Sequence, residues 1–315
     1  MKYPGMRRFL LAAAAASSVL LASCGGGSVV GQITPSRIVV LGDAFSDVGQ
    51  SGNKYTVNDG SVNNWTQQLA SSYGLTITAQ SAGGTGYAQG NARITLKPDA
   101  GGGNVRTVTE QVDAFLAAGT PQANDLVVLG GGLSDIIVET MNTAQGAAQR
   151  LANVQQAARE LAAQVRRVVN AGGKQVVIVG VYDIGRTPWA KALGRETEIR
   201  DLAAKFNEAL KVALADLGNT VLYLDTANYF NFLFNQPASF DLSNIDSAVC
   251  TATASGTNGI GISASAHVSS RVCTGSTLVS GANVDTTMFA DPVYPTPRVH
   301  RLFGDNAYNR IHERF

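Results

Sequence analysis

Residues suited to acyl-transfer chemistry gather in four short blocks of this chain. Such chemistry uses carboxylates and hydroxyls to move protons, and the N–H groups of tight turns to stabilise an oxyanion. The blocks read, in order, Gly42-Asp43-Ala44-Phe45-Ser46-Asp47, Gly86-Tyr87-Ala88-Gln89-Gly90-Asn91-Ala92, Gly130-Gly131-Gly132-Leu133-Ser134-Asp135 and Asp291-Pro292-Val293-Tyr294. Histidine, the commonest general base, occurs in none of these four blocks.

Taken together and in this order, the four blocks resemble the signature blocks of the GDSL, or SGNH, ester hydrolases. The resemblance extends from Arg37 to the C-terminus, and the joint occurrence of the blocks is more specific than any block alone. It implies the α/β fold of that family and, as the family activity, hydrolysis of carboxylic esters and lipids. The supporting positions that it identifies are Gly42, Asp43, Ser46, Asp47, Asp135 and His300.

The same resemblance indicates that the reacting groups are replaced. Ala44 stands where the family has its nucleophilic serine, and Tyr294 stands where it has the histidine base, with the orienting acid Asp291 retained. Of the two oxyanion positions, Gly90 keeps its backbone N–H, whereas Ser134 replaces an asparagine. Loss of a triad serine or histidine lowers turnover by about a million-fold. We therefore predict a pseudoenzyme that uses the inherited cleft to bind a ligand or partner.

An active ester hydrolase with a rearranged site is the alternative. Its nucleophile would be Ser46 or Ser134, and its base would be His300. The ordinary role of a serine such as Ser46 is to cap or hydrogen-bond a turn, and the ordinary role of His300 on a helix is packing. The two hypotheses are distinguished by whether Ser46 lies within hydrogen-bond reach of His300.

A second hypothesis concerns the replaced base. The phenol of Tyr294 has an ordinary pKa near 10, so at neutral pH it is a donor rather than a proton acceptor. We expect its hydroxyl to bond Asp291 and so to satisfy a carboxylate that lost its histidine. His267 and His312 have no partner in the sequence that suggests a metal site, and we expect no metal or cofactor.

Alternating apolar strands and amphipathic helices predict an α/β fold with a doubly wound parallel sheet, a flavodoxin-like three-layer sandwich. Strands that are apolar at consecutive positions are covered on both faces, and they are expected at 37–41, 125–129, 175–181 and 220–224. Helices are expected at 63–73, 107–118, 144–170, 196–217 and 297–309. Two long stretches, 83–104 and 241–287, interrupt the alternation as functional loops or inserts.

The first 35 residues indicate export and a lipid anchor. Residues 1–23 combine two arginines with a short apolar stretch, as in a signal peptide, and end beside Cys24 in a pattern that resembles the bacterial lipobox. Lipidated Cys24 would tether the chain to a membrane through a flexible segment, 24–35, ahead of a single domain over 36–315. The family rule for the next residue points to the outer membrane of a Gram-negative bacterium. Ordinary cleavage without lipidation is the alternative.

The composition of the chain limits the classes of partner that we expect it to bind. The chain has 315 residues, a formal net charge of +1 and no long basic run, so it lacks the electrostatic footprint of a nucleic-acid-binding protein. In an oxidising compartment, Cys250 and Cys273 become candidate disulfide partners, with two free thiols as the alternative. The ligands that we expect for the cleft are an ester, an acyl chain or a glycan.

Overall fold

The computed structural model describes residues 33–61, 64–254 and 267–315, and within it residues 33–314 form one compact unit. The expected signal peptide, Cys24 and most of the tether lie outside the described residues, as do residues 255–266 of the expected insert. In the part of the chain that is described, no helix is both long and apolar enough to cross a membrane.

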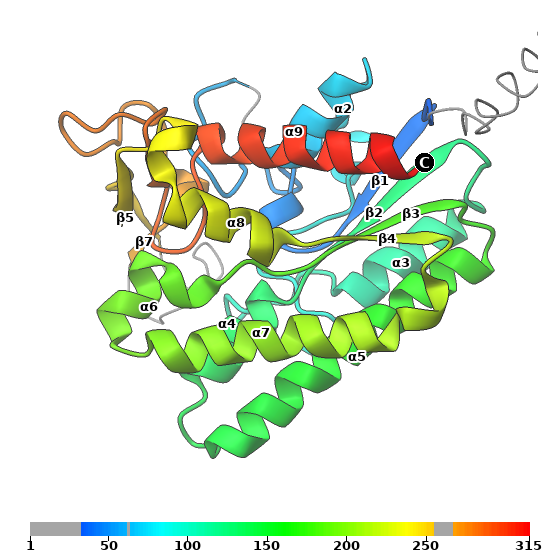
Figure 1. The fold of residues 1–315 in the computed structure, drawn as a ribbon, viewed down its shortest axis with the longest axis horizontal. Helices are drawn as coiled ribbons and strands as arrows, with labels where there is room; N and C mark the ends of the chain where they lie inside the picture. The colour runs from blue at the N-terminus through cyan, green and yellow to red at the C-terminus, as the bar shows by residue number, and fades with distance from the viewer. Residues whose placement is uncertain (1–32, 62–63, 255–266) are drawn as a thin grey trace, which may run out of the picture. The chain divides into compact units, whose positions relative to one another are not determined.

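A parallel sheet lies at the centre of this unit (Figure 1). Its strands follow the order β1-β2-β3-β4. They are β1 (Arg37–Leu41), β2 (Asp125–Leu129), β3 (Gln175–Val179) and β4 (Val221–Leu224). Val39, Val127 and Val176 occupy matching positions across the first three strands and are fully buried, because helices cover both faces. The predicted parallel sheet is confirmed.

The outer edge of β1 is occupied by a short extended segment at 85–88. The Val40 N–H donates to the Thr85 carbonyl (3.1 Å), and the Tyr87 N–H donates to the Val40 carbonyl (2.7 Å). The chain therefore places one neighbour on each side of β1, first this segment and then β2. In doubly wound sheets, ligands bind at the carboxyl ends of the strands where the chain changes direction in this way.

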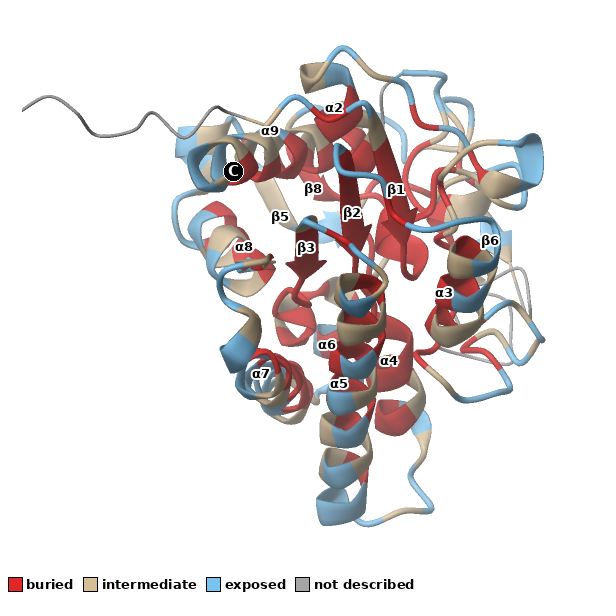
Figure 2. Cartoon of the chain, turned by 90° about the vertical axis from the view of Figure 1, so that its right-hand side faces the viewer, coloured by how far each residue is buried: buried red, intermediate tan, exposed pale blue. Residues whose placement is uncertain are grey.

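Two layers of helices enclose the sheet (Figures 1 and 2). One layer holds α2 (Trp65–Ser72), α8 (Thr226–Asn235) and α9 (Pro297–Arg314), and the other holds α3 (Val108–Ala117), α5 (Ala147–Asn170) and α7 (Glu196–Ala213). The five predicted helices are all present. The short helices α4 (Leu133–Met141), α6 (Pro188–Leu193) and the longer α8 were not predicted.

The insert forms a small structure of its own beside the sheet. Strand β5 (Asn244–Ala248) pairs with β8 (Thr287–Phe289), and β6 (Thr253–Ala254) pairs with β7 (His267–Val268). Cys250 and Cys273 are joined by a disulfide and, with three other buried residues, make a separate apolar cluster of Val57, Val249, Cys250, Cys273 and Ala290. The Asn58 N–H donates to the Cys273 carbonyl (2.9 Å), which joins the insert to the loop after block one.

Candidate functional site

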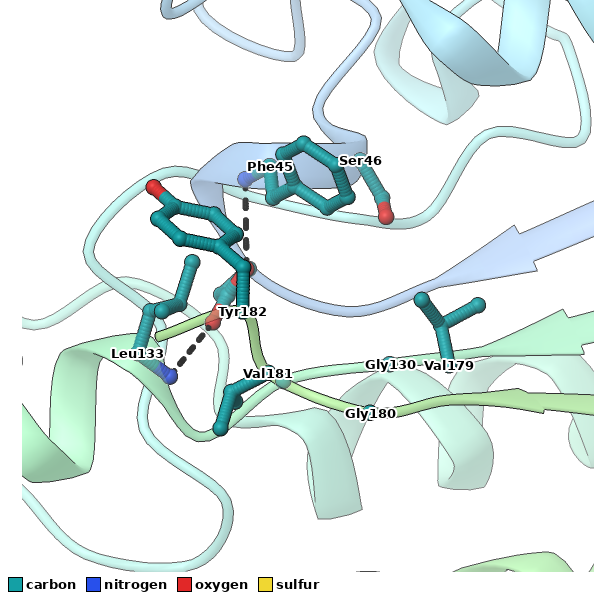
Figure 3. Close-up of a pocket in the computed structure, with 10 residues that line it drawn as sticks. Phe45, Ser46, Gly130, Leu133, Val179, Gly180, Val181 and Tyr182 are labelled. Atoms are coloured by element: carbon teal, nitrogen blue, oxygen red, sulfur yellow. Dashed lines mark hydrogen bonds between the residues drawn. The ribbon is translucent and has the colours of Figure 1, made fainter. Parts of the chain in front are cut away.

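The first and third blocks meet at the carboxyl ends of β1 and β2. Residues Ala44–Ser46 form one turn of 3-10 helix directly after β1. The carboxylate of Asp43 accepts the Phe45 N–H (3.2 Å) inside that turn and the Leu133 N–H (3.1 Å) at the start of α4 (Figure 3). A buried aspartate thus caps two helix N-termini at once, where its negative charge is favourable.

Asp47 joins the first block to the second. One carboxylate oxygen accepts the N–H groups of Gly49 (2.8 Å) and Gln50 (2.7 Å), and the other accepts the N–H of Gly90 (2.8 Å). The resemblance assigns the Gly90 N–H to an oxyanion. Here that N–H is already paired with a carboxylate, so it is not available to a substrate.

Asp135 joins the third block back to the second. Its carboxylate accepts the Ile94 N–H (3.0 Å) and an N–H of the Arg93 guanidinium (3.2 Å). Two residues before Arg93 lies Asn91, at the second glycine of the family block, with a φ of 64°. Asparagine tolerates this left-handed conformation better than most residues, so the turn survives the loss of glycine.

The fourth block is held by a residue that sequence reasoning missed. Asp291 accepts the N–H groups of Val293 (2.8 Å) and Tyr294 (2.7 Å), and both the N–H (2.8 Å) and the hydroxyl (2.5 Å) of Ser270. Ser270 comes from the insert, and its place beside Cys273 in a serine-rich stretch gave no signal of this role.

The hypothesis that the Tyr294 hydroxyl bonds Asp291 in place of the histidine is wrong. The Tyr294 hydroxyl is buried and has no hydrogen-bond partner among the described residues. The carboxylate is satisfied by Ser270 and by backbone amides instead. The Ser134 hydroxyl is likewise buried and has no hydrogen-bond partner in this part of the chain.

The replaced residues are buried, and one oxyanion position is covered by a tyrosine ring. Tyr55 packs against Gly90 so closely that a β-carbon there would lie 2.0 Å from the ring, and its ring meets Tyr294 edge to face at 5.3 Å. Ala44, Ser134, Asp291 and Tyr294 are each at most 1 % exposed. These positions are therefore closed off from solvent, and Tyr55 contributes to that closure at Gly90 and Tyr294.

A small cavity remains on the sheet side of the turn (Figure 3). It holds about 10 Å³, room for about one water molecule, and is lined by Asp43, Ser46, Gly130, Val179 and their neighbours. Ser46 therefore faces a space too small for an ester substrate.

His300 lies beside the ring of Phe45, with the two ring centroids 5.3 Å apart. Its Nδ1 accepts the Trp65 N–H (3.2 Å) at the start of α2, which leaves the ring proton on Nε2. No hydrogen bond joins Ser46 to His300 among the described residues. The contact on which the rearranged hydrolase depends is not formed.

Comparison with known proteins identifies the family to which this chain belongs. The model of the GDSL-like lipase/acylhydrolase family matches residues 38–307, most of the chain. The chain belongs to the GDSL lipase/acylhydrolase family. A phosphatidylcholine-sterol acyltransferase of Aeromonas hydrophila is 24% identical over 89% of this chain and 91% of its own length. Lipase 1 of Photorhabdus luminescens is 30% identical, over 49% of this chain and 23% of its own length.

Solved structures of esterases are also similar to this GDSL-family chain. A carbohydrate acetylesterase from Sinorhizobium meliloti has a TM-score of 0.48 at 11% identity, covering 89% of this chain and 99% of its own. The native M. smegmatis aryl esterase has a TM-score of 0.45 at 12% identity, with the same coverage of both chains.

Burial controls the protonation of the site in this family member. It raises the pKa of Asp43, Asp47 and Asp135 to about 6 each, against the opposing effect of the N–H groups that they accept. Burial also raises the pKa of Tyr294 well above its ordinary value and lowers the pKa of His300 to about 3. At neutral pH the phenol keeps its proton and the imidazole is uncharged. Within the described residues, no group of three or more acidic, histidine or cysteine side chains is arranged to hold a metal ion.

The two hydroxyls near Asp291 should respond differently to removal. Tyr294→Phe removes a buried hydroxyl without a partner, so the free energy of unfolding should stay unchanged or rise by about 1 kcal/mol. Ser270→Ala removes a hydrogen bond to a buried carboxylate and should lower it by about 1.5–3 kcal/mol. Urea denaturation at pH 7 measures both. A clear loss of stability in Tyr294→Phe would mean that its hydroxyl has a partner after all.

The stability of the folded protein should depend on pH through the protonation of His300. Its pKa is lowered in the folded protein, so the unfolded chain binds a proton between about pH 6.5 and 3 that the folded protein does not bind. The stability that the neutral ring contributes is therefore full above about pH 6.5 and is lost as the pH falls toward 3. His300→Asn keeps an acceptor for the Trp65 N–H but cannot titrate. The difference in unfolding free energy between wild type and His300→Asn should shrink from pH 7 to pH 4, measured by urea denaturation.

The buried aspartates act in the opposite direction. Their raised pKa values mean that stability falls as the pH rises from about 4 to 6. Because both proteins keep these aspartates, their effect cancels in the difference. A difference that is constant between pH 7 and 4 would contradict the assignment.

Proposed function

We propose that this chain is a catalytically inactive member of the GDSL family and that it functions by binding rather than by hydrolysis. The observation that carries the proposal is the methyl group of Ala44 at the tip of the turn that follows β1. No oxygen, sulfur or nitrogen of that side chain can attack a carbonyl carbon.

The surroundings of Ala44 support the same conclusion. The Gly90 N–H is paired with Asp47, the Ser134 side chain is too short to replace the asparagine of the family, and Tyr294 is a protonated phenol. Removing a triad serine or histidine costs about a million-fold in turnover, and removing an oxyanion donor alone costs about 100- to 1000-fold. Each loss is severe, and they fall on one site.

The alternative of an active carboxylic-ester hydrolase has less support. It requires a hydroxyl activated by His300, yet the free lone pair of that ring is used by the Trp65 N–H. Two relatives are named as a lipase and an acyltransferase, so ester chemistry occurs in the family. Their names do not change the fact that Ala44 has no nucleophilic atom.

Ester turnover is the direct test. The full chain, purified in detergent, should hydrolyse nitrophenyl acetate and nitrophenyl octanoate no faster than buffer, and Ser46→Ala and His300→Asn should match it. Ala44→Ser should also stay inactive, because Tyr294 cannot act as its base. Turnover above buffer that either Ser46→Ala or His300→Asn abolishes would overturn the proposal and identify part of a rearranged site.

We also propose that lipidated Cys24 anchors the chain in the outer membrane after export. Arg7, Arg8, the apolar stretch that follows and the small residues before Cys24 support this. In a Gram-negative host grown with labelled palmitate, the full chain should carry the label and sediment with outer membranes. Cys24→Ser should lose both properties, and a label that survives this substitution would contradict the proposal.

A further inference from the structure

A polar groove lies beside the closed site. It has a volume of about 290 Å³ and is formed by three stretches far apart in the chain: the turn after block one, the segment around block two and the residues just before α3. The residues that give it its character are Gln50, Gln80, Tyr87, Gln89, Asn104 and Arg106. Gln89 directly precedes Gly90, so the groove begins where the inherited site ends.

The walls of the groove are held by the carboxylate that closes the old site. Asp47 accepts the N–H of Gln50 (2.7 Å) on one wall and the N–H of Gly90 (2.8 Å), next to Gln89, on the other. The side chain of Gln50 also connects its wall to the segment around block two. Its oxygen accepts the Ser81 N–H (2.7 Å), and its nitrogen donates to the Gly86 carbonyl (2.8 Å). The groove is therefore preformed, as binding sites for small ligands usually are.

Arg106 orients two of the carboxamides. Its guanidinium donates to the side-chain oxygen of Gln80 (3.2 Å), and its backbone N–H donates to the side-chain oxygen of Gln89 (3.3 Å). Each carboxamide oxygen thus accepts one hydrogen bond from Arg106, which directs the two amide nitrogens to act as donors elsewhere. Among the described residues, no hydrogen bond engages these nitrogens. The groove therefore presents more donors than acceptors.

The charge and shape of the residues that line the groove limit the chemical class of ligand that it can bind. Arg106 is charged, and no acidic residue lines the groove, which favours a ligand with a carboxylate. Val105 is the only aliphatic side chain of the lining, which disfavours an acyl chain. The ring of Tyr87 is half-buried and held edge to face against Phe115 (5.9 Å), so it forms a rigid aromatic wall. An aromatic wall, amide donors and a guanidinium together suit a sugar ring that carries an acid group.

We propose that this groove binds a short acidic saccharide, with a uronate carboxylate on Arg106 and sugar hydroxyls on the amides of Gln80 and Gln89. The volume is at the lower end for small-ligand sites, which favours a short segment over a long chain. The inference rests on the proposed binding function, and it places the ligand in the groove beside the buried catalytic positions rather than at those positions.

Calorimetric titration of the full chain in detergent tests the inference. Trigalacturonate should bind, maltotriose should bind at least ten-fold more weakly because it lacks the carboxylate, and inorganic phosphate should bind at least ten-fold more weakly because it lacks sugar rings. Arg106→Gln and Tyr87→Leu should each weaken trigalacturonate binding at least ten-fold. Arg159→Gln is the matched control: it is exposed on α5, and its guanidinium also donates to a glutamine side chain, so binding should not change.

Three results would overturn the inference. They are no binding of trigalacturonate, equal binding of phosphate, and equal weakening by Arg106→Gln and Arg159→Gln. Circular dichroism of each variant checks that the fold is retained. The nitrophenyl ester assay on the same preparation separates the two claims, because turnover there would overturn the proposed inactivity, whereas failed titration would overturn only the saccharide groove.

Discussion

Buried carboxylates that accept backbone N–H groups hold this site together. Asp43 links the turn after β1 to α4, Asp47 links that turn to the second block, and Asp291 links the fourth block to the insert. A carboxylate removed from water is costly unless it is fully hydrogen-bonded, so each one constrains the loops that supply its donors. Loops from distant parts of the chain consequently meet in one arrangement.

The same interactions occupy the glycine N–H that the family resemblance assigns to an oxyanion. Here Asp47 takes the Gly90 N–H, and Tyr55 lies over it. Ser270 occupies one side of Asp291, and the disulfide-linked insert keeps it there. Two hydroxyls in this arrangement, those of Ser134 and Tyr294, are buried and have no hydrogen-bond partner in the described chain.

An aromatic cluster fixes the turn from the opposite side. Phe45 contacts the rings of Trp65, Tyr182, Phe230, His300 and Phe303, with centroids 5.3–6.0 Å apart. These partners come from α2, the segment after β3, α8 and α9, so the residue that follows Ala44 anchors the turn in the core. This packing, together with the hydrogen bond from the Trp65 N–H, gives His300 a structural role.

The sequence by itself determined the strands, the main helices and the parallel sheet, and its family resemblance assigned Ala44, Ser134 and Tyr294 to the positions of the reacting groups. These features follow from local patterns, since apolar runs mark buried strands and short motifs mark the turns between strand and helix. Helix α4 (Leu133–Met141) was missed because its first residues belong to the third block, which was interpreted only as a motif. Only the tertiary structure decided that Tyr55 covers Gly90, that Ser270 satisfies Asp291 and that Arg106 donates to the side chains of two glutamines. Each of these contacts joins residues more than 15 positions apart, and the burial and hydrogen-bond geometry that select them exist only once the chain has folded.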